Sequence, residues 1–119
     1  MKIVVTTHGT DLDSAVDPRF GRARYFLLVD TETLQSTAHE HTQSHASQGA
    51  GIQAAQAVAR LGADAVITGR VGPKAFATLR AAGIAVYVAA SGTARQVLEQ
   101  FQAGRLAKAE GANVGGHWA

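Results

Sequence analysis

The spacing of apolar residues changes near residue 49, and this change predicts two differently built halves of one domain. Before it, β-branched and aromatic runs separated by polar connections predict strands at residues 2–7, 24–30 and 34–41. Short connections favour an antiparallel meander. The run at 2–7 is apolar almost throughout, so we expect it to be the buried central strand.

After residue 49 the pattern alternates between helix and strand. Pro73 suits a first helical position, and Thr93 followed by Gln96 resembles a capping box. Glycines stand where helices are expected to end. The predicted elements are helices that begin near residues 49, 73 and 93, with strands at 65–69 and 84–89 between them.

This element order predicts an α/β fold with a mixed five-stranded sheet and helices on its faces. Residues 1–104 would form the single domain. Residues 105–119 are rich in glycine and poor in large apolar side chains, which predicts a flexible C-terminal tail.

Composition narrows the function classes. Of the 119 residues, 46% are hydrophobic and 17% charged, which excludes a disordered chain, and no apolar run is long enough for a membrane span. With no apparent signal peptide, we expect a cytoplasmic protein. There is no cysteine, so thiolate metal sites and cysteine catalysis are excluded. A net charge of +2 gives no argument for a nucleic-acid partner.

The predicted topology brings several loops to one edge of the sheet, which we call the top edge, at the carboxyl end of strand 2–7. Ligands of such sheets bind beyond the carboxyl ends of the strands. Three helix starts would also lie there, and each carries partial positive charge. We therefore expect an anionic ligand at this edge. The basic residues predicted there are His8, Arg19, Arg22, His45, Arg70 and Lys74.

The stretch from residue 39 to 54 is the most suggestive part of this edge. Its three histidines precede Gly49 and Gly51, which would open the first helix. Unpaired backbone N–H groups at a helix start suit an anion, and glycines allow it to approach closely. His45 is either a metal ligand or a loop residue that bonds to backbone, and His8 is either a ligand or a cap of the central strand.

Other readings of single residues also stay open. Arg19 either binds the anion or braces its loop against Asp17. His39 and His41 would share a strand face and could bind a metal between them, but solvated positions on an edge strand fit them better. His117 either reaches the site or belongs to a disordered end.

Three enzymatic or nucleotide-binding readings fit poorly. Residues 49–54 match a dinucleotide fingerprint in form, but they follow a polar third strand and lack the acidic residue at the required distance. A two-metal nuclease would need carboxylates on the central strand, and strand 2–7 has none. The chain also has no G-x-S-x-G nucleophile elbow.

Several motifs together resemble the dinitrogenase iron–molybdenum cofactor biosynthesis family, which includes NifX- and NafY-like carriers and the carboxyl-terminal domain of NifB. The similarity extends over nearly the whole chain, and the segment at 14–26 is its most specific part. The matching motifs are Ser14-x-Val16-Asp17-Pro18-Arg19-Phe20-Gly21-Arg22-Ala23-x-Tyr25-Phe26, Gly49-Ala50-Gly51, Gly69-x-x-Gly72-Pro73-x-Ala75 and Leu79-x-x-Ala82-Gly83-Ile84-x-Val86-Tyr87.

The resemblance implies a ribonuclease-H-like three-layer fold and a non-enzymatic carrier of an anionic iron–sulfur or iron–molybdenum cluster, with cofactor-biosynthesis or nitrogenase proteins as partners. Lacking cysteine, this chain would hold such a cargo by imidazole, backbone N–H groups and arginine charge. The alternative is a small-molecule or nucleotide-anion sensor, or an interaction module, that has kept the fold without a cluster. The expected binding residues are His8, Arg19, Arg22, His45, Gly49 and Gly51, with His45 and His8 as the metal ligands.

Overall fold

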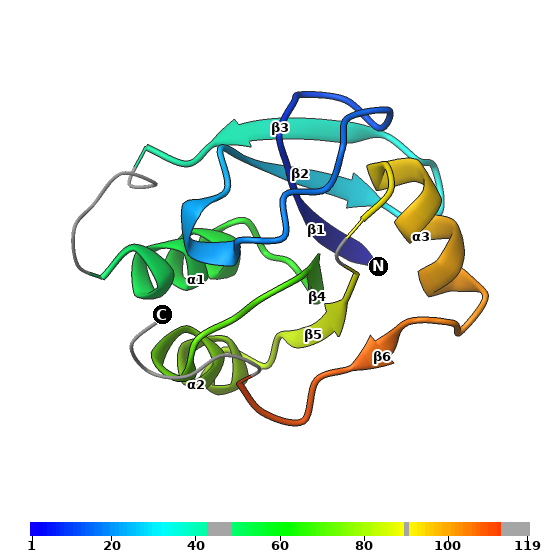
Figure 1. Cartoon of the computed structure of the whole chain (residues 1–119). Coiled ribbons are helices and arrows are strands. Elements are labelled where there is room, and N and C mark those ends of the chain that lie inside the picture. Colours follow the sequence, from blue (N-terminus) through cyan, green and yellow to red (C-terminus); the bar gives the residue numbers. More distant parts are fainter. Residues whose placement is uncertain (43–48, 90, 113–119) are drawn as a thin grey trace.

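A computed structural model describes residues 1–42, 49–89 and 91–112. One six-stranded sheet runs through the molecule in the order β3-β2-β1-β4-β5-β6 (Figure 1). The predicted central position of β1 is thereby confirmed. The strands are β1 (Lys2–Thr7), β2 (Tyr25–Asp30), β3 (Ser36–Glu40), β4 (Ala65–Thr68), β5 (Ala85–Val88) and β6 (Ala107–Lys108).

Helices cover both faces of the sheet, which gives three layers. Figure 1 shows α1 and α2 together on one face and α3 on the other, and two separate cores agree with this arrangement. A short 3₁₀ helix, η1, precedes β2. The helices are η1 (Phe20–Arg22), α1 (Ala50–Arg60), α2 (Pro73–Ala81) and α3 (Ala94–Gln102).

The two cores follow from the alternation of side chains along β1. Val4 points into the core with α1 and α2, whereas Ile3 and Val5 point into the core with α3. All three are fully buried. Because successive side chains of a strand point to opposite faces, an apolar run without alternation is the pattern of a strand covered on both sides.

The register confirms the predicted topology and the top edge. β1 pairs antiparallel with β2 and parallel with β4, and β4 pairs parallel with β5. Thr7 at the end of β1 lies opposite Tyr25 at the start of β2, and Tyr25 lies opposite Glu40 at the end of β3. The chain therefore leaves β1, β3, β4 and β5 at the same edge.

The prediction of five strands is wrong by one edge strand. Ala107 and Lys108 pair antiparallel with Val88 and Tyr87 of β5, inside the segment predicted as a glycine-rich tail. A two-residue strand has too little pattern to be recognised in a sequence. Residues 113–119, including His117, lie outside the described residues. Among the described helices, none is long and apolar enough to cross a membrane.

Candidate functional site

The loop between β1 and η1 is fastened across the top edge by backbone hydrogen bonds to three elements. The N–H of Asp17 donates to the carbonyl of Thr6 at 2.8 Å, and the N–H of Val16 donates to the carbonyl of Gly92 ahead of α3 at 2.9 Å. Farther along, the N–H of Arg70 after β4 donates to the carbonyl of Pro18 at 2.6 Å. These bonds make the loop a rigid cover over the strand ends.

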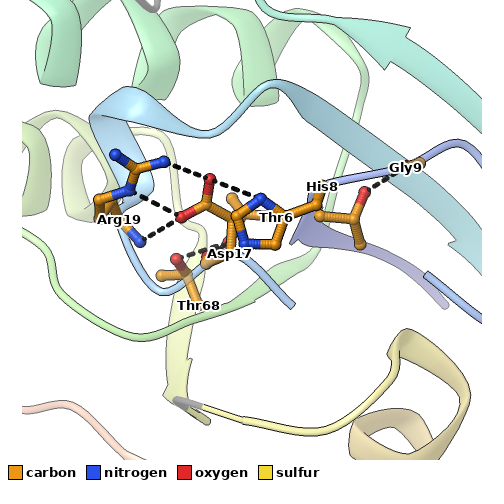
Figure 2. Close-up of polar contacts among 7 residues, drawn as sticks. Thr6, His8, Gly9, Asp17, Arg19 and Thr68 are labelled. Carbon is orange, nitrogen blue, oxygen red and sulfur yellow. Dashed lines mark hydrogen bonds and ion pairs between the residues drawn. The ribbon is translucent and has the colours of Figure 1, made fainter. Parts of the chain in front are cut away.

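Asp17 is the polar centre of this loop (Figure 2). Its side chain is only 1% exposed. The carboxylate accepts hydrogen bonds from the backbone N–H of Arg19 at 3.0 Å, from Nε at 3.1 Å and from Nη2 at 3.1 Å. The Nδ1 atom of His8 lies 3.6 Å from Oδ2 of the same carboxylate. Two predicted site residues, His8 and Arg19, therefore meet at one buried carboxylate.

The charges of this cluster are coupled. Burial would raise the pKa of Asp17, but the hydrogen bonds from Arg19 and the positive charge of its guanidinium outweigh burial and hold that pKa below its ordinary value. The same hydrogen bonds raise the pKa of Arg19. Asp17 is thus an anion and Arg19 a cation at neutral pH. The structure bears out the bracing interpretation of Arg19, whose charge is largely matched by Asp17.

Two buried threonines support Asp17 from below. The hydroxyl oxygens of Thr6 and Thr68 lie 2.7 Å apart, and that of Thr6 also lies 2.7 Å from the main-chain carbonyl of Asp17. A carbonyl can only accept, so Thr6 donates to it and accepts from Thr68. Both side chains are fully buried at the ends of neighbouring strands. Sequence reasoning missed this pair, whose signal is a hydroxyl at the carboxyl end of each of two apolar strands.

A second junction joins η1 to the start of α1. A Cβ atom on Gly21 would lie 2.9 Å from both the N and Cα atoms of Gly51, closer than real side-chain contacts. Gly51 is therefore the point where η1 packs on the helix. Gly49 is the N-cap of α1 with φ of 75°, in the left-handed region that favours glycine. The predicted helix start, Gly49, Gly51 and the turn that carries Arg22 thus lie together.

The three helix starts at the top edge differ in how their N–H groups are used. Those of Ala94 and Arg95 in α3 donate to the carbonyls of Ser14 and Leu12, and that of Gln96 donates to the hydroxyl of Thr93. The start of α3 is consequently occupied by the chain itself, and its first N–H groups are not open to a ligand. In the described part of the chain, no side chain caps α1.

The partial positive charge at the start of α1 is not balanced by an acidic side chain of the helix. None of the helices α1, α2 and α3 in the described residues has an acidic residue in its first turn, and Arg22 ends the 3₁₀ helix packed against α1. Acidic side chains commonly occupy the first turn because the helix dipole attracts them. Their absence leaves this positive end suited to an external anion.

His41 departs from its predicted position. The solvated edge-strand reading is wrong for it, because the residue is 4% exposed. Its Nε2 atom lies 3.1 Å from the carbonyl oxygen of Gly21, and its ring packs 4.9 Å from that of Phe26. Burial lowers the pKa of His41, and the positive charge of Arg22 lowers it further. The histidine is neutral at pH 7 and ties the end of β3 to η1.

The described residues hold no group of three or more histidine, aspartate, glutamate or cysteine side chains that could enclose a metal ion. Of the two predicted metal ligands, His8 stands at the top edge with a half-exposed side chain. His45, the other, lies outside the described residues. The remaining predicted binding residues, Arg19, Arg22, Gly49 and Gly51, occupy two adjoining junctions of the same edge.

Comparisons with known proteins find one matching family model and a related sequence. The model described as "Dinitrogenase iron-molybdenum cofactor" matches residues 1–104. An uncharacterised protein from Methanocaldococcus jannaschii is 30% identical over 101 residues, which cover 82% of this chain and 86% of the relative.

Solved structures share the fold. The apo form of the orange protein from Desulfovibrio gigas is 44% identical, with a TM-score of 0.92 and coverage of 95% of this chain and 96% of that one. A Thermotoga structure described as a candidate NifB protein is 36% identical, with a TM-score of 0.77 over 88% of this chain and 90% of that chain. Both solved structures therefore have the overall fold of this chain.

Proposed function

The chain belongs to the dinitrogenase iron–molybdenum cofactor family, and from that membership we propose that it is a non-enzymatic carrier or accessory protein that binds an anionic iron–sulfur or iron–molybdenum cluster, or its precursor, at the top edge. The family is involved in the biosynthesis and binding of this cofactor. The relative from Desulfovibrio gigas is described as an apo form, a word used for a protein that also has a ligand-bound form.

The observation that carries the proposal is the start of α1. It has no acidic residue in its first turn, and within the described residues no side chain caps it. The tight contact between Gly21 and Gly51 holds Arg22 next to it. An anion at this position would receive backbone N–H groups and a guanidinium from two elements that are already locked together, which lowers the cost of ordering them.

We assign the following roles within this proposal. Gly49 allows the cargo close to the backbone, and Gly51 keeps η1 packed against the helix start. Arg22 supplies charge, and His8 and His45 supply nitrogen ligands. Arg19 contributes mainly by holding the loop, because Asp17 matches its charge. Without cysteine, the cargo is held more weakly than a resident iron–sulfur centre, which suits transfer to a partner in cofactor biosynthesis.

Anaerobic reconstitution with iron and sulfide tests the proposal. We expect a coloured protein-bound species in the wild type and roughly tenfold weaker binding in Arg22→Gln, equivalent to about 1.4 kcal/mol. The matched control is Arg60→Gln, which removes the same charge from the other end of α1 and should bind normally. Likewise, His45→Ala should lose colour where His39→Ala does not. Equal binding by the two arginine variants would contradict the proposal.

A sensor or interaction module remains the second candidate, and the absence of cysteine is the observation that favours it. A ligand that binds only the native state stabilises it. A colourless protein whose melting temperature rises with phosphate-bearing ligands, and does not rise in Arg22→Gln, would replace the carrier by this alternative.

A further inference from the structure

His8 occupies a place that differs from that of the other described histidines. It follows β1 directly, and 52% of its side chain is exposed at the top edge. Its Nδ1 atom faces inward and lies 3.6 Å from Oδ2 of the buried Asp17 (Figure 2). In contrast, His41 is buried and bonded to a carbonyl, and the ion pairs found among the described residues do not include His39.

The position of Asp17 does not depend on His8. Three hydrogen bonds from Arg19 hold its carboxylate, and its backbone is bonded to Thr6. The carboxylate of Asp17 is therefore fixed before His8 meets it, and it determines which nitrogen of the imidazole carries the proton. A neutral imidazole beside a carboxylate places its proton on the facing nitrogen, here Nδ1. The lone pair then lies on Nε2, at the far side of a half-exposed ring.

This arrangement is the one that metal-binding histidines use. A histidine that ligates a metal commonly donates its other N–H to a carboxylate, which fixes the tautomer and makes the ligating nitrogen more basic. At 3.6 Å the contact is longer than a hydrogen bond. Metal binding at Nε2 makes Nδ1–H a stronger donor and would tighten it.

We propose that His8 is a metal anchor of the cargo, ligating through Nε2, and that Asp17 is its positioning residue. This inference rests on the proposed carrier function. Few ligands from the protein are consistent with the described residues, which offer no set of three metal-ligating side chains. A cluster held by few imidazoles and by charge can leave through fewer ligand exchanges than one bound by many protein ligands.

The tautomer of His8 can be read without any cargo. In a long-range ¹H–¹⁵N correlation spectrum of the neutral form, we expect the proton on Nδ1 in the wild type. Asp17→Asn should shift His8 toward the Nε2–H tautomer. Asp13→Asn removes an exposed carboxylate from the same loop and should keep the wild-type tautomer, so it separates the effect of Asp17 from a general loss of charge in the loop. A wild-type His8 protonated on Nε2 would overturn the proposal.

Zn²⁺ serves as the probe for ligation. Titration should move the Nε2 resonance of His8 before that of His39, and Asp17→Asn should weaken binding at His8 by about tenfold or more. An unchanged response in Asp17→Asn would overturn the positioning role. If the tautomer and the Zn²⁺ response are as expected but no iron–sulfur species forms, the anchor stands and the proposed cargo is wrong.

Discussion

Asp17 connects more of the site than any other single residue. It contacts His8 and Arg19 through its carboxylate and Thr6 through its main chain, and it is almost fully buried. A buried charge is tolerated only when it is paired and hydrogen-bonded. The residue therefore ties the stability of the loop to the geometry of the site.

Asp17→Asn should make the protein both less stable and less sensitive to acid. Charge-assisted hydrogen bonds are lost, at a cost of roughly 2 kcal/mol in the free energy of unfolding at pH 7. The folded-state pKa of Asp17 is lowered, so its contribution is present above its unfolded pKa of about 3.9 and is lost as pH falls through the folded pKa. Urea unfolding at pH 7 and pH 3 measures both effects.

Asp30→Asn is the control for this experiment. The pKa of Asp30 is also lowered, by a backbone hydrogen bond from Glu32, but its carboxylate lies in a turn at the opposite edge of the sheet. We expect the free energy of unfolding of this variant to fall between pH 7 and pH 3 by nearly as much as that of the wild type. If the free energy of unfolding of Asp17→Asn falls between pH 7 and pH 3 as much as that of the wild type, the role of Asp17 is contradicted.

Gly21→Ala tests the junction between η1 and α1. The added Cβ would meet the backbone of Gly51 at 2.9 Å, and backbone on both sides cannot give way. We expect destabilisation of about 1 to 3 kcal/mol and weaker cargo binding. Gly111→Ala is the matched control, since its Cβ position meets no heavy atom within 4 Å among the described residues other than its chain neighbours. Urea unfolding and reconstitution that find both variants alike would refute the close packing.

At the scale of elements, the backbone N–H groups at the start of α3 donate both to the loop between β1 and η1 and to the capping residue of the helix. Thr93 forms a capping box with Gln96, as its sequence predicts. Thr93→Ala should lower the free energy of unfolding by about 1 kcal/mol. Thr78→Ala removes a hydroxyl that bonds back to the carbonyl of Lys74 within α2 and should be nearly neutral. Thermal melts that rank the two variants in the opposite order would contradict this account.

The sequence predicted the elements well because their signals are local. Pro73 and Thr93 mark the helix starts, and the apolar run of β1 identifies a central strand. Contacts between distant segments were not predictable in the same way. The carbonyl of Ser14 reaches the N–H of Ala94 only because the loop folds over the sheet, and His41 is buried because η1 packs on it.

At the scale of the whole molecule, the two ends of the strands form two edges of the sheet with different roles. The top edge gathers the loops that hold His8, Asp17, Arg22 and the start of α1. At the opposite edge, the N–H of Lys2 donates to the carboxylate of Asp64, and the hydroxyl of Thr31 donates to the carbonyl of Met1. These bonds hold the amino terminus to the connections after β2 and before β4. The mixed sheet with helices on its faces confirms the predicted α/β class, and the ribonuclease-H-like relationship stays a prediction.

Paramagnetic broadening of backbone amides by the bound iron–sulfur species would locate the cargo directly. Broadening of an amide signal falls steeply with distance from the metal, so a ¹H–¹⁵N spectrum of the reconstituted protein maps the site. We predict that the signals of Gly21 and Gly51 at the top edge disappear while those of Asp30 and Asp64 at the opposite edge stay sharp. Broadening centred on Asp30 and Asp64, or spread evenly over the chain, would contradict a cargo site at the top edge.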